Sequence, residues 1–107
     1  MKKYKRILIK ISGEALQNKE KGLNHDPEIL SKVAAQFKQM LSQGAEIAVV
    51  VGGGNIFRGL AGSDTGTDRT TGDYMGMLAT VINSMAIQNA LENEGIHTRV
   101  MTAISMP

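Results

Sequence analysis

Apolar residues along the chain fall into three short runs and two longer amphipathic stretches. The runs at residues 6–11 and 46–51 are rich in β-branched side chains and are followed closely by glycine, which predicts two buried strands. A third run predicts a strand over residues 97–104. Apolar residues recur at helical spacing over residues 26–44 and from about 73 to 94, which predicts two helices. The predicted order is therefore strand, helix, strand, helix, strand.

Both predicted helices carry end signals. Asp26 is a capping residue before Pro27, and proline suits the first turn of a helix. Gly44 ends the first helix and Gly95 the second. Asp73 opens the second helix, where an aspartate is an ordinary N-cap. The residues expected to face the core are Ile29, Leu30, Val33, Ala34, Phe37, Met40 and Leu41 in the first helix, and Met77, Leu78, Val81, Ile82, Met85 and Leu91 in the second.

This order of elements predicts an α/β fold with a mostly parallel sheet. Right-handed crossovers bring the carboxyl ends of the first two strands to one edge, where open α/β sheets bind their ligands. Ser12 and Gly13 follow the first strand, and residues 52–54 follow the second. We therefore expect two glycine-containing turns to face one cleft. Residues 14–25 and 55–71 are rich in polar and turn-forming residues and are predicted to be loops.

Composition and charge narrow the class of protein. A chain of 107 residues with 42% hydrophobic and 21% charged residues fits one ordinary globular domain, or part of one. It has no cysteine, and His25 and His97 stand apart from other metal-binding side chains, so neither a disulfide nor a metal site is predicted. No apolar stretch approaches the ~20 residues of a membrane span, and the N-terminus lacks the apolar core of a signal peptide. We expect a cytoplasmic protein that does not bind membranes.

Net charge is only +2, and much of the basic excess lies in residues 2–6. That run is short and contains a single aromatic residue, Tyr4. It favours a solvated lead-in to the first strand over contact with nucleic acid.

The three consecutive glycines, Gly52, Gly53 and Gly54, are the most informative residues of the sequence. Glycine permits positive φ angles and leaves no Cβ to hold a ligand away, so successive amides can converge on an anion. Arg58 lies four residues beyond Gly54 and offers a planar, bidentate cation to the same phosphate. The alternative is a plain strand-to-loop turn. Three glycines with an arginine close behind favour phosphate binding.

Two charged residues have two readings each. Lys10 interrupts the first strand, and its ammonium suits a phosphoryl oxygen that gains charge during transfer. A lysine at a strand end also extends into solvent without any such role. The two glycine turns at the same edge favour the phosphate role. Asp73 suits a sugar hydroxyl, because a carboxylate repels phosphate, and helix capping explains it equally well.

Two widespread nucleotide-binding patterns are missing. The glycine turn lacks the third glycine of GxGxxG, because Phe57 stands at that position. The pattern GxxxxGK[ST] occurs nowhere in the chain. A dinucleotide-dependent dehydrogenase and a P-loop enzyme are therefore disfavoured, and another design of phosphate loop stays open.

Three blocks of sequence carry a family resemblance: residues 10–16 (KISGEAL), 52–59 (GGGNIFRG) and 72–80 (GDYMGMLAT). They resemble the signatures of the bacterial UMP kinases, or uridylate kinases, of the amino acid kinase family. The blocks occur in the family's order and spacing, and the resemblance covers essentially the whole chain. It implies a three-layer α/β/α fold and a homohexamer. It also implies transfer of the γ-phosphate of ATP to UMP, which gives UDP in the presence of Mg²⁺.

The resemblance also implies roles for individual residues. The residues that correspond to the ATP site are Lys10, Ile11, Ser12, Gly13, Gly54 and Arg58, and those that correspond to the UMP site are Gly53 and Asp73. Lys10 would stabilise charge on the transferred phosphoryl group. Arg58 would hold phosphates where donor and acceptor meet. These two cations are the expected catalytic residues, because phosphoryl transfer depends on positioning and electrostatics and needs no dedicated general base.

Two departures limit what the resemblance implies. Residues 18–24 do not support the response to GTP that the family shows in this region. The family's members are also about twice as long as this chain. Residues 1–107 correspond to the N-terminal, UMP- and phosphate-binding part of the domain, without the C-terminal ATP-binding part and its adenine pocket, so we expect little activity from this chain alone.

Two other functions stay open. One is a kinase of the same family that phosphorylates a carboxylate or a carbamate. The sequence of residues 72–77 argues against it. The other is a nucleotide-binding module without turnover, which would bind UMP and form no UDP.

Overall fold

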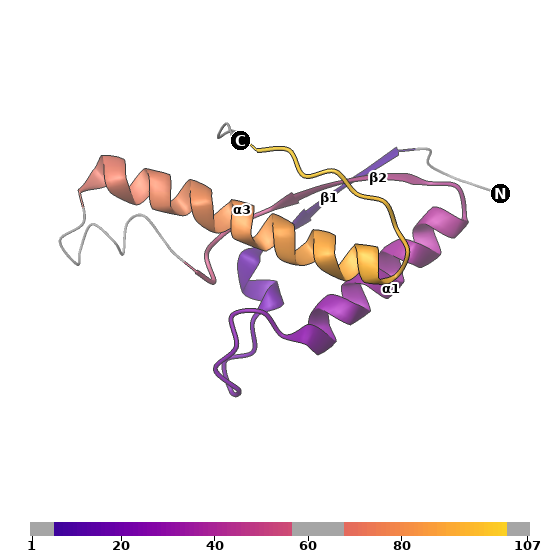
Figure 1. Ribbon diagram of the computed structural model, residues 1–107, viewed down its shortest axis with the longest axis horizontal. Helices are drawn as coiled ribbons and strands as arrows, with labels where there is room; N and C mark the ends of the chain where they lie inside the picture. Colours follow the sequence, from indigo (N-terminus) through magenta and orange to yellow (C-terminus); the bar gives the residue numbers. More distant parts are fainter. Residues whose placement is uncertain (1–5, 57–67, 103–107) are drawn as a thin grey trace.

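A computed structural model describes residues 6–56 and 68–102 of the chain (Figure 1). Its elements, in chain order, are strand β1 (Arg6–Ile11), a short 3₁₀ turn η1 (Gly13–Leu16), helix α1 (Pro27–Ser42), strand β2 (Glu46–Val51) and helix α3 (Arg69–Asn93). The two predicted strands have the expected bounds. The predicted loop over residues 14–25 is partly wrong, because η1 occupies its start and Leu16 is fully buried.

The two strands form a parallel pair, as their order along the chain predicts. Arg6 pairs with Glu46 at one end, and Ile11 pairs with Val51 at the other. Beyond the last pair, the backbone N–H of Gly52 donates to the carbonyl oxygen of Ile11 at 3.0 Å. The carboxyl ends of both strands therefore meet at one edge of the sheet, and the turns that follow them start side by side.

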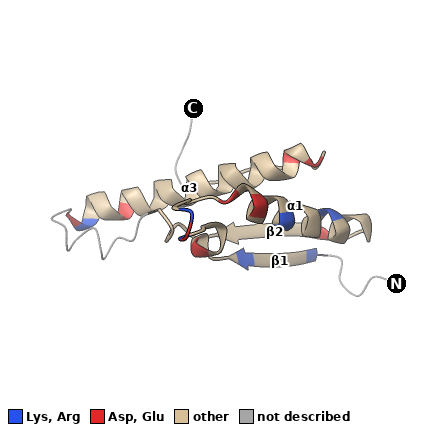
Figure 2. Cartoon of the chain, turned by 90° about the horizontal axis from the view of Figure 1, so that it is seen from below, with Lys and Arg blue, Asp and Glu red and all other residues tan. Residues whose placement is uncertain are grey.

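Both helices lie on the same side of the two strands (Figure 2). Alternate strand residues are half-buried under the helices, and those between them are exposed, as period-two alternation dictates. The core is centred on Leu16, Ala34, Phe37, Ile87 and Leu91. On the other face of the sheet, Leu8 is 70% exposed and Val50 is 51% exposed. The α/β class and the parallel sheet are confirmed, and the described residues form two of the three layers that the resemblance implies.

Helix α1 begins and ends as its sequence predicts. The Asp26 carboxylate accepts a hydrogen bond from the backbone N–H of Glu28 at 2.9 Å, and Pro27 occupies the first turn. Gly44 follows the helix with a φ of 89°, a left-handed conformation that glycine adopts without strain. The predicted stripe is buried or half-buried along its whole length.

Helix α3 begins earlier than predicted. Its N-cap is Asp68, whose carboxylate accepts a hydrogen bond from the backbone N–H of Thr71 at 2.7 Å. Gly72 and Asp73 therefore lie inside the helix, and the prediction that Asp73 caps it is wrong. The predicted loop over residues 55–71 ends at Asp68, and residues 57–67 lie outside the described part. Gly95, with a φ of 79°, ends the helix as expected.

The core-facing side of α3 also differs from the prediction. Leu78, Ile82 and Met85 were expected to face inward, and they are about half exposed. Val81 and Leu91 are buried as predicted, and Ala79, Asn83 and Ile87, which were not predicted to face the core, are buried as well. Because α3 is apolar on two faces, helical spacing alone does not identify the face that packs on the sheet.

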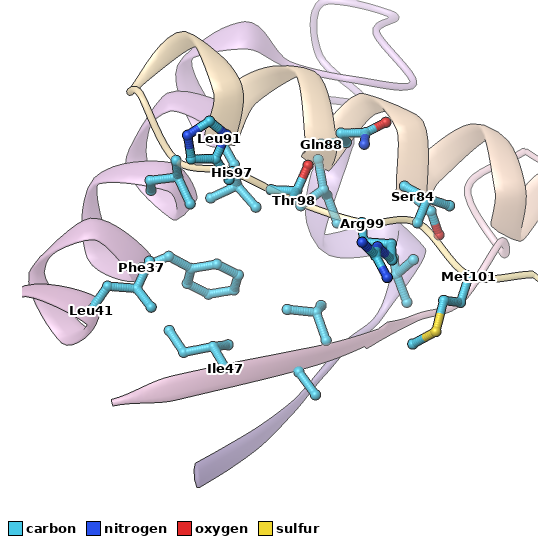
Figure 3. A pocket seen from close by; sticks show the side chains of 16 residues that line it. Phe37, Leu41, Ile47, Ser84, Gln88, Leu91, His97, Thr98, Arg99 and Met101 are labelled. Atoms are coloured by element: carbon cyan, nitrogen blue, oxygen red, sulfur yellow. The ribbon is translucent and has the colours of Figure 1, made fainter. Parts of the chain in front are cut away.

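The predicted third strand does not form over residues 97–102, the part of it that the structure describes. A segment becomes a strand only when its backbone pairs with a neighbour, and no ladder joins these residues to β2. A mainly apolar cavity of about 380 Å³ lies between this segment, β2 and the two helices. Figure 3 shows His97, Thr98 and Arg99 on the side of this cavity opposite Ile47.

Candidate functional site

The two turns that follow β1 and β2 touch each other. A Cβ atom added to Gly13 would lie 2.7 Å from the carbonyl oxygen of Gly52 and 2.5 Å from Oδ1 of Asn55. Real Cβ atoms do not approach other atoms so closely, so only glycine fits at this position. The Ser12 hydroxyl accepts a hydrogen bond from the backbone N–H of Glu14 at 3.3 Å and starts the η1 turn. The expected meeting of the two turns at one edge is confirmed.

Gly53 is held against helix α3. A Cβ atom added there would lie 2.7 Å from the Cβ of Ala79 and 3.0 Å from the backbone nitrogen of Thr80. Neither Gly52 nor Gly53 has a positive φ. The expected left-handed conformation is therefore absent at both positions. Close packing on α3 requires glycine at Gly53, whereas a Cβ on Gly52 would lie 3.6 Å from its nearest neighbour, the backbone nitrogen of Gly13.

A buried amide lies behind the two turns. Asn83, in the middle of α3, has no exposed surface. Its Nδ2 donates to the carbonyl oxygen of Gly52 and to Oδ1 of Asn55, both at 2.7 Å. The same Nδ2 atom would lie 2.9 Å from a Cβ on Gly13. One side chain thus contacts both turns.

The orientation of this amide is fixed by its partners. Because Nδ2 of Asn83 faces a carbonyl oxygen, Oδ1 faces the Nε2 atom of His25, which must carry a proton to donate to it. Asn55 in turn donates from Nδ2 to the carbonyl oxygen of Asn24 at 2.9 Å. The polar network of His25, Asn55 and Asn83 therefore joins three segments: the loop before α1, the glycine turn and α3.

Sequence reasoning missed this network. It treated His25 as isolated and did not single out Asn55 or Asn83. One signal was present: Asn83 stands four residues from both Ala79 and Ile87, on a stripe that is otherwise apolar. A polar residue at a buried position of a helix needs hydrogen-bond partners, and here those partners are the turns.

The remaining predicted residues lie around the same edge. Ile11 is half-buried and supplies the carbonyl that pairs with Gly52, and Gly54 is half-buried in the turn. Lys10 is exposed, on the strand face that the helices leave bare. Asp73 is exposed in the second turn of α3. Arg58 lies outside the described residues.

These findings can be compared with known proteins. The model of the amino acid kinase family matches residues 5–107. The chain belongs to the amino acid kinase family. A solved UMP kinase from Ureaplasma parvum superimposes with a TM-score of 0.85 and 37% identity, covering 95% of this chain and 44% of that one. A UMP kinase from Bacillus anthracis gives a TM-score of 0.76 and 38% identity over 85% of this chain and 37% of that one.

The chain spans less than half the length of these two amino acid kinase relatives. Within this family portion, the edge formed by the two glycine turns presents small side chains and backbone groups. Such an edge suits a ligand that is recognised by amide N–H groups, of which phosphate is the usual example.

Charge around the site is sparse. Two carboxyl groups have a lowered pKa: Asp26, because Asn18 and the Glu28 backbone donate to it, and Asp68, because the Thr71 backbone donates to it. Both are helix caps.

Among residues 6–56 and 68–102, no group of three acidic or histidine side chains has the arrangement of a metal site. No helix in these ranges is long and apolar enough to cross a membrane.

Proposed function

We propose that this chain is the N-terminal part of a kinase that transfers the γ-phosphate of ATP to UMP, giving UDP and ADP. One observation carries the proposal: the Gly13 turn and the Gly52 turn meet at the carboxyl edge of a parallel sheet, and they approach too closely for a side chain at Gly13. In open α/β sheets this edge is where ligands bind. The likeness to two UMP kinases, at 37% and 38% identity, supports the choice of UMP as acceptor.

In this proposal the donor phosphates bind at the first turn. The residues assigned to ATP are Lys10, Ile11, Ser12, Gly13, Gly54 and Arg58. An oxygen of the UMP phosphate attacks the γ-phosphorus, and the bond from that phosphorus to the bridging oxygen of ADP breaks. Lys10 and Arg58 neutralise the charge that develops on the transferred group. Mg²⁺ would enter with ATP, bound to phosphate oxygens of the substrate, and would neutralise part of their charge.

The acceptor binds on the side of α3. We assign Gly53 and Asp73 to UMP, with the Asp73 carboxylate accepting a hydrogen bond from a ribose hydroxyl. Two findings support this assignment. Gly53 packs directly on Ala79 and Thr80 of α3, so the glycine turn lies against the helix that carries Asp73. Asp73 is exposed and is not the helix cap, so its carboxylate is not engaged in capping α3.

We also propose a homohexamer that works in the cytoplasm, and a catalytic domain that needs a second half to bind adenine. The exposed apolar side chains of α3 support assembly with other copies. This chain matches only 44% of the Ureaplasma enzyme, which supports the proposal that adenine binding needs a second half of the domain.

The experiment that tests the proposal is a substrate panel. The protein with its native flanking sequence is incubated with ATP, Mg²⁺ and UMP, CMP, a carboxylic acid or carbamate, and products are identified by ³¹P NMR. We expect UDP from UMP and little product from the others. Formation of an acyl phosphate or a carbamoyl phosphate would instead identify a kinase of the same family that acts on a carboxylate or a carbamate. Binding of UMP by calorimetry without UDP formation would identify a module without turnover.

A further inference from the structure

A fully buried amide in the middle of an apolar helix face calls for a physical explanation. Burying an amide costs free energy unless its hydrogen bonds are remade inside the protein. Asn83 makes all of its described side-chain hydrogen bonds to residues outside its own helix: His25, Gly52 and Asn55. Its side chain therefore joins α3 to loops, where an apolar residue would join it only to the core.

The place where these contacts are made is informative. Nδ2 of Asn83 contacts the carbonyl oxygen of Gly52, and the same atom lies against the open side of Gly13. The amide consequently lies between the first turn and the glycine turn. Any shift of this amide changes the distance between the two turns.

We propose that Asn83 is a positioning residue, which sets the separation of the two phosphate-facing turns, and that His25 fixes the orientation of its amide. This inference rests on the proposed function, because the separation of the turns affects catalysis only if phosphates bind to both. His25 contributes by donating from Nε2 to Oδ1 of Asn83. That bond leaves only Nδ2 free to face Gly52. Positioning of this kind matters because a misplacement of about 1 Å can cost ~100-fold in rate.

Substitution of His25 should perturb the fold less than substitution of Asn83, because His25 is half-buried and lies at the edge of the network. His25→Ala removes the side chain that donates to Asn83. His25→Gln keeps a donor, since the side-chain amide nitrogen of glutamine can lie near the position of the histidine Nε2 atom. Asn83→Asp puts a carboxylate oxygen opposite the Gly52 carbonyl and disrupts the network at its centre. Asn89→Asp is the matched control, because Asn89 is an exposed asparagine of the same helix.

Two measurements are made on the protein with its native flanking sequence. The first is amide hydrogen exchange at residues 52–55, normalised to the amides of α1. We expect His25→Ala to speed this exchange about tenfold, the usual consequence of losing one buried hydrogen bond. The second is the steady-state rate of UDP formation from UMP and ATP. We expect kcat to fall about tenfold in His25→Ala with KM changed less than threefold, because the turns still bind but hold the phosphates poorly.

The conservative variant separates positioning from general stability. We expect His25→Gln to recover most of the exchange protection and of kcat, and Asn89→Asp to match the wild type. If His25→Ala and Asn83→Asp only lower the melting temperature, with normal exchange at residues 52–55 and normal kcat per folded molecule, the inference is wrong. A wild-type protein that forms no UDP overturns the proposed function, and with it the catalytic part of this inference. The exchange comparison then still decides whether Asn83 holds the two turns.

Discussion

At Gly13 three polar atoms occupy the surroundings of the missing side chain. A Cβ would lie within 3 Å of atoms of Gly52, Asn55 and Asn83. We expect Gly13→Ala to lower the free energy of unfolding by about 1–3 kcal/mol, because the turns must separate and the buried amide loses part of its hydrogen bonding. Chemical denaturation monitored by circular dichroism measures this change.

Gly76 supplies the matched control for that substitution. It lies in α3 with nothing within 4 Å of the position of an added Cβ. Since glycine in a helix interior costs roughly 0.5–1 kcal/mol relative to alanine, Gly76→Ala should stabilise the protein by that amount. If both substitutions destabilise equally, the contact between the two turns is not what excludes a side chain at Gly13.

Asp73 gives a second test at the scale of single residues. Its carboxylate is exposed and does not cap α3. We expect Asp73→Asn to raise KM for UMP about tenfold and to leave KM for ATP nearly unchanged, because a neutral amide is a weaker acceptor for a ribose hydroxyl. Initial rates at varied concentrations of each nucleotide measure the split. An equal rise in both KM values would place Asp73 outside the UMP site.

Helix α1 depends on the ionised form of its N-cap. Donation from Asn18 and from the Glu28 backbone lowers the pKa of Asp26 below its ordinary value of 3.8. A lowered folded-state pKa stabilises the protein above the ordinary value, and this contribution disappears as pH falls through the folded-state pKa. The asparagine of the Asp26→Asn variant does not titrate. We therefore expect the melting temperature of this variant to fall less than that of the wild type when the pH is lowered from 6 to 2. Equal losses would show that Asp26 does not contribute to the acid sensitivity.

The elements differ in how far their sequence determines them. The bounds of β1 and β2 follow from β-branched runs, and α1 follows from its cap, its proline and one apolar stripe. Helix α3 was harder to predict, because Asp68 and Asp73 both offer a cap and two of its faces are apolar. The segment at residues 97–102 could not be assigned from its own sequence, since a strand forms only where a partner strand accepts its hydrogen bonds.

At the scale of the whole molecule, the chain topology made the meeting of the two turns predictable, but not the polar network behind them. Parallel strands joined by a helix must end at one edge, so Ser12, Gly13 and the glycine turn were expected together, and they touch. The network behind them was not predictable, because it joins His25, Asn55 and Asn83 across up to 58 positions of sequence. Such contacts leave no spacing pattern in the sequence.

The outer side of α3 bears on assembly. Tyr74, Leu78, Ile82 and Met85 recur at helical spacing and are 47–58% exposed. Residues 74–91 contain no charged side chain, and Figure 2 shows that the middle of α3 carries neither blue nor red. An uncharged stripe meets a second copy of itself around a two-fold axis without repulsion between like charges. Each large apolar side chain gains about 1.5–3 kcal/mol when fully buried, so a pair of stripes can drive association.

This side of α3 yields a prediction for the assembled protein. We expect the double substitution Leu78→Lys and Ile82→Lys to reduce the mass measured by sedimentation velocity, because an isologous contact places four new positive charges close together. The core should remain folded, since both side chains are about half exposed in the isolated chain. Gln36→Lys adds a charge at an exposed position of the other helix, α1, and serves as the control. An unchanged mass in the double variant, with normal circular dichroism, would show that this side of α3 is not the contact between copies.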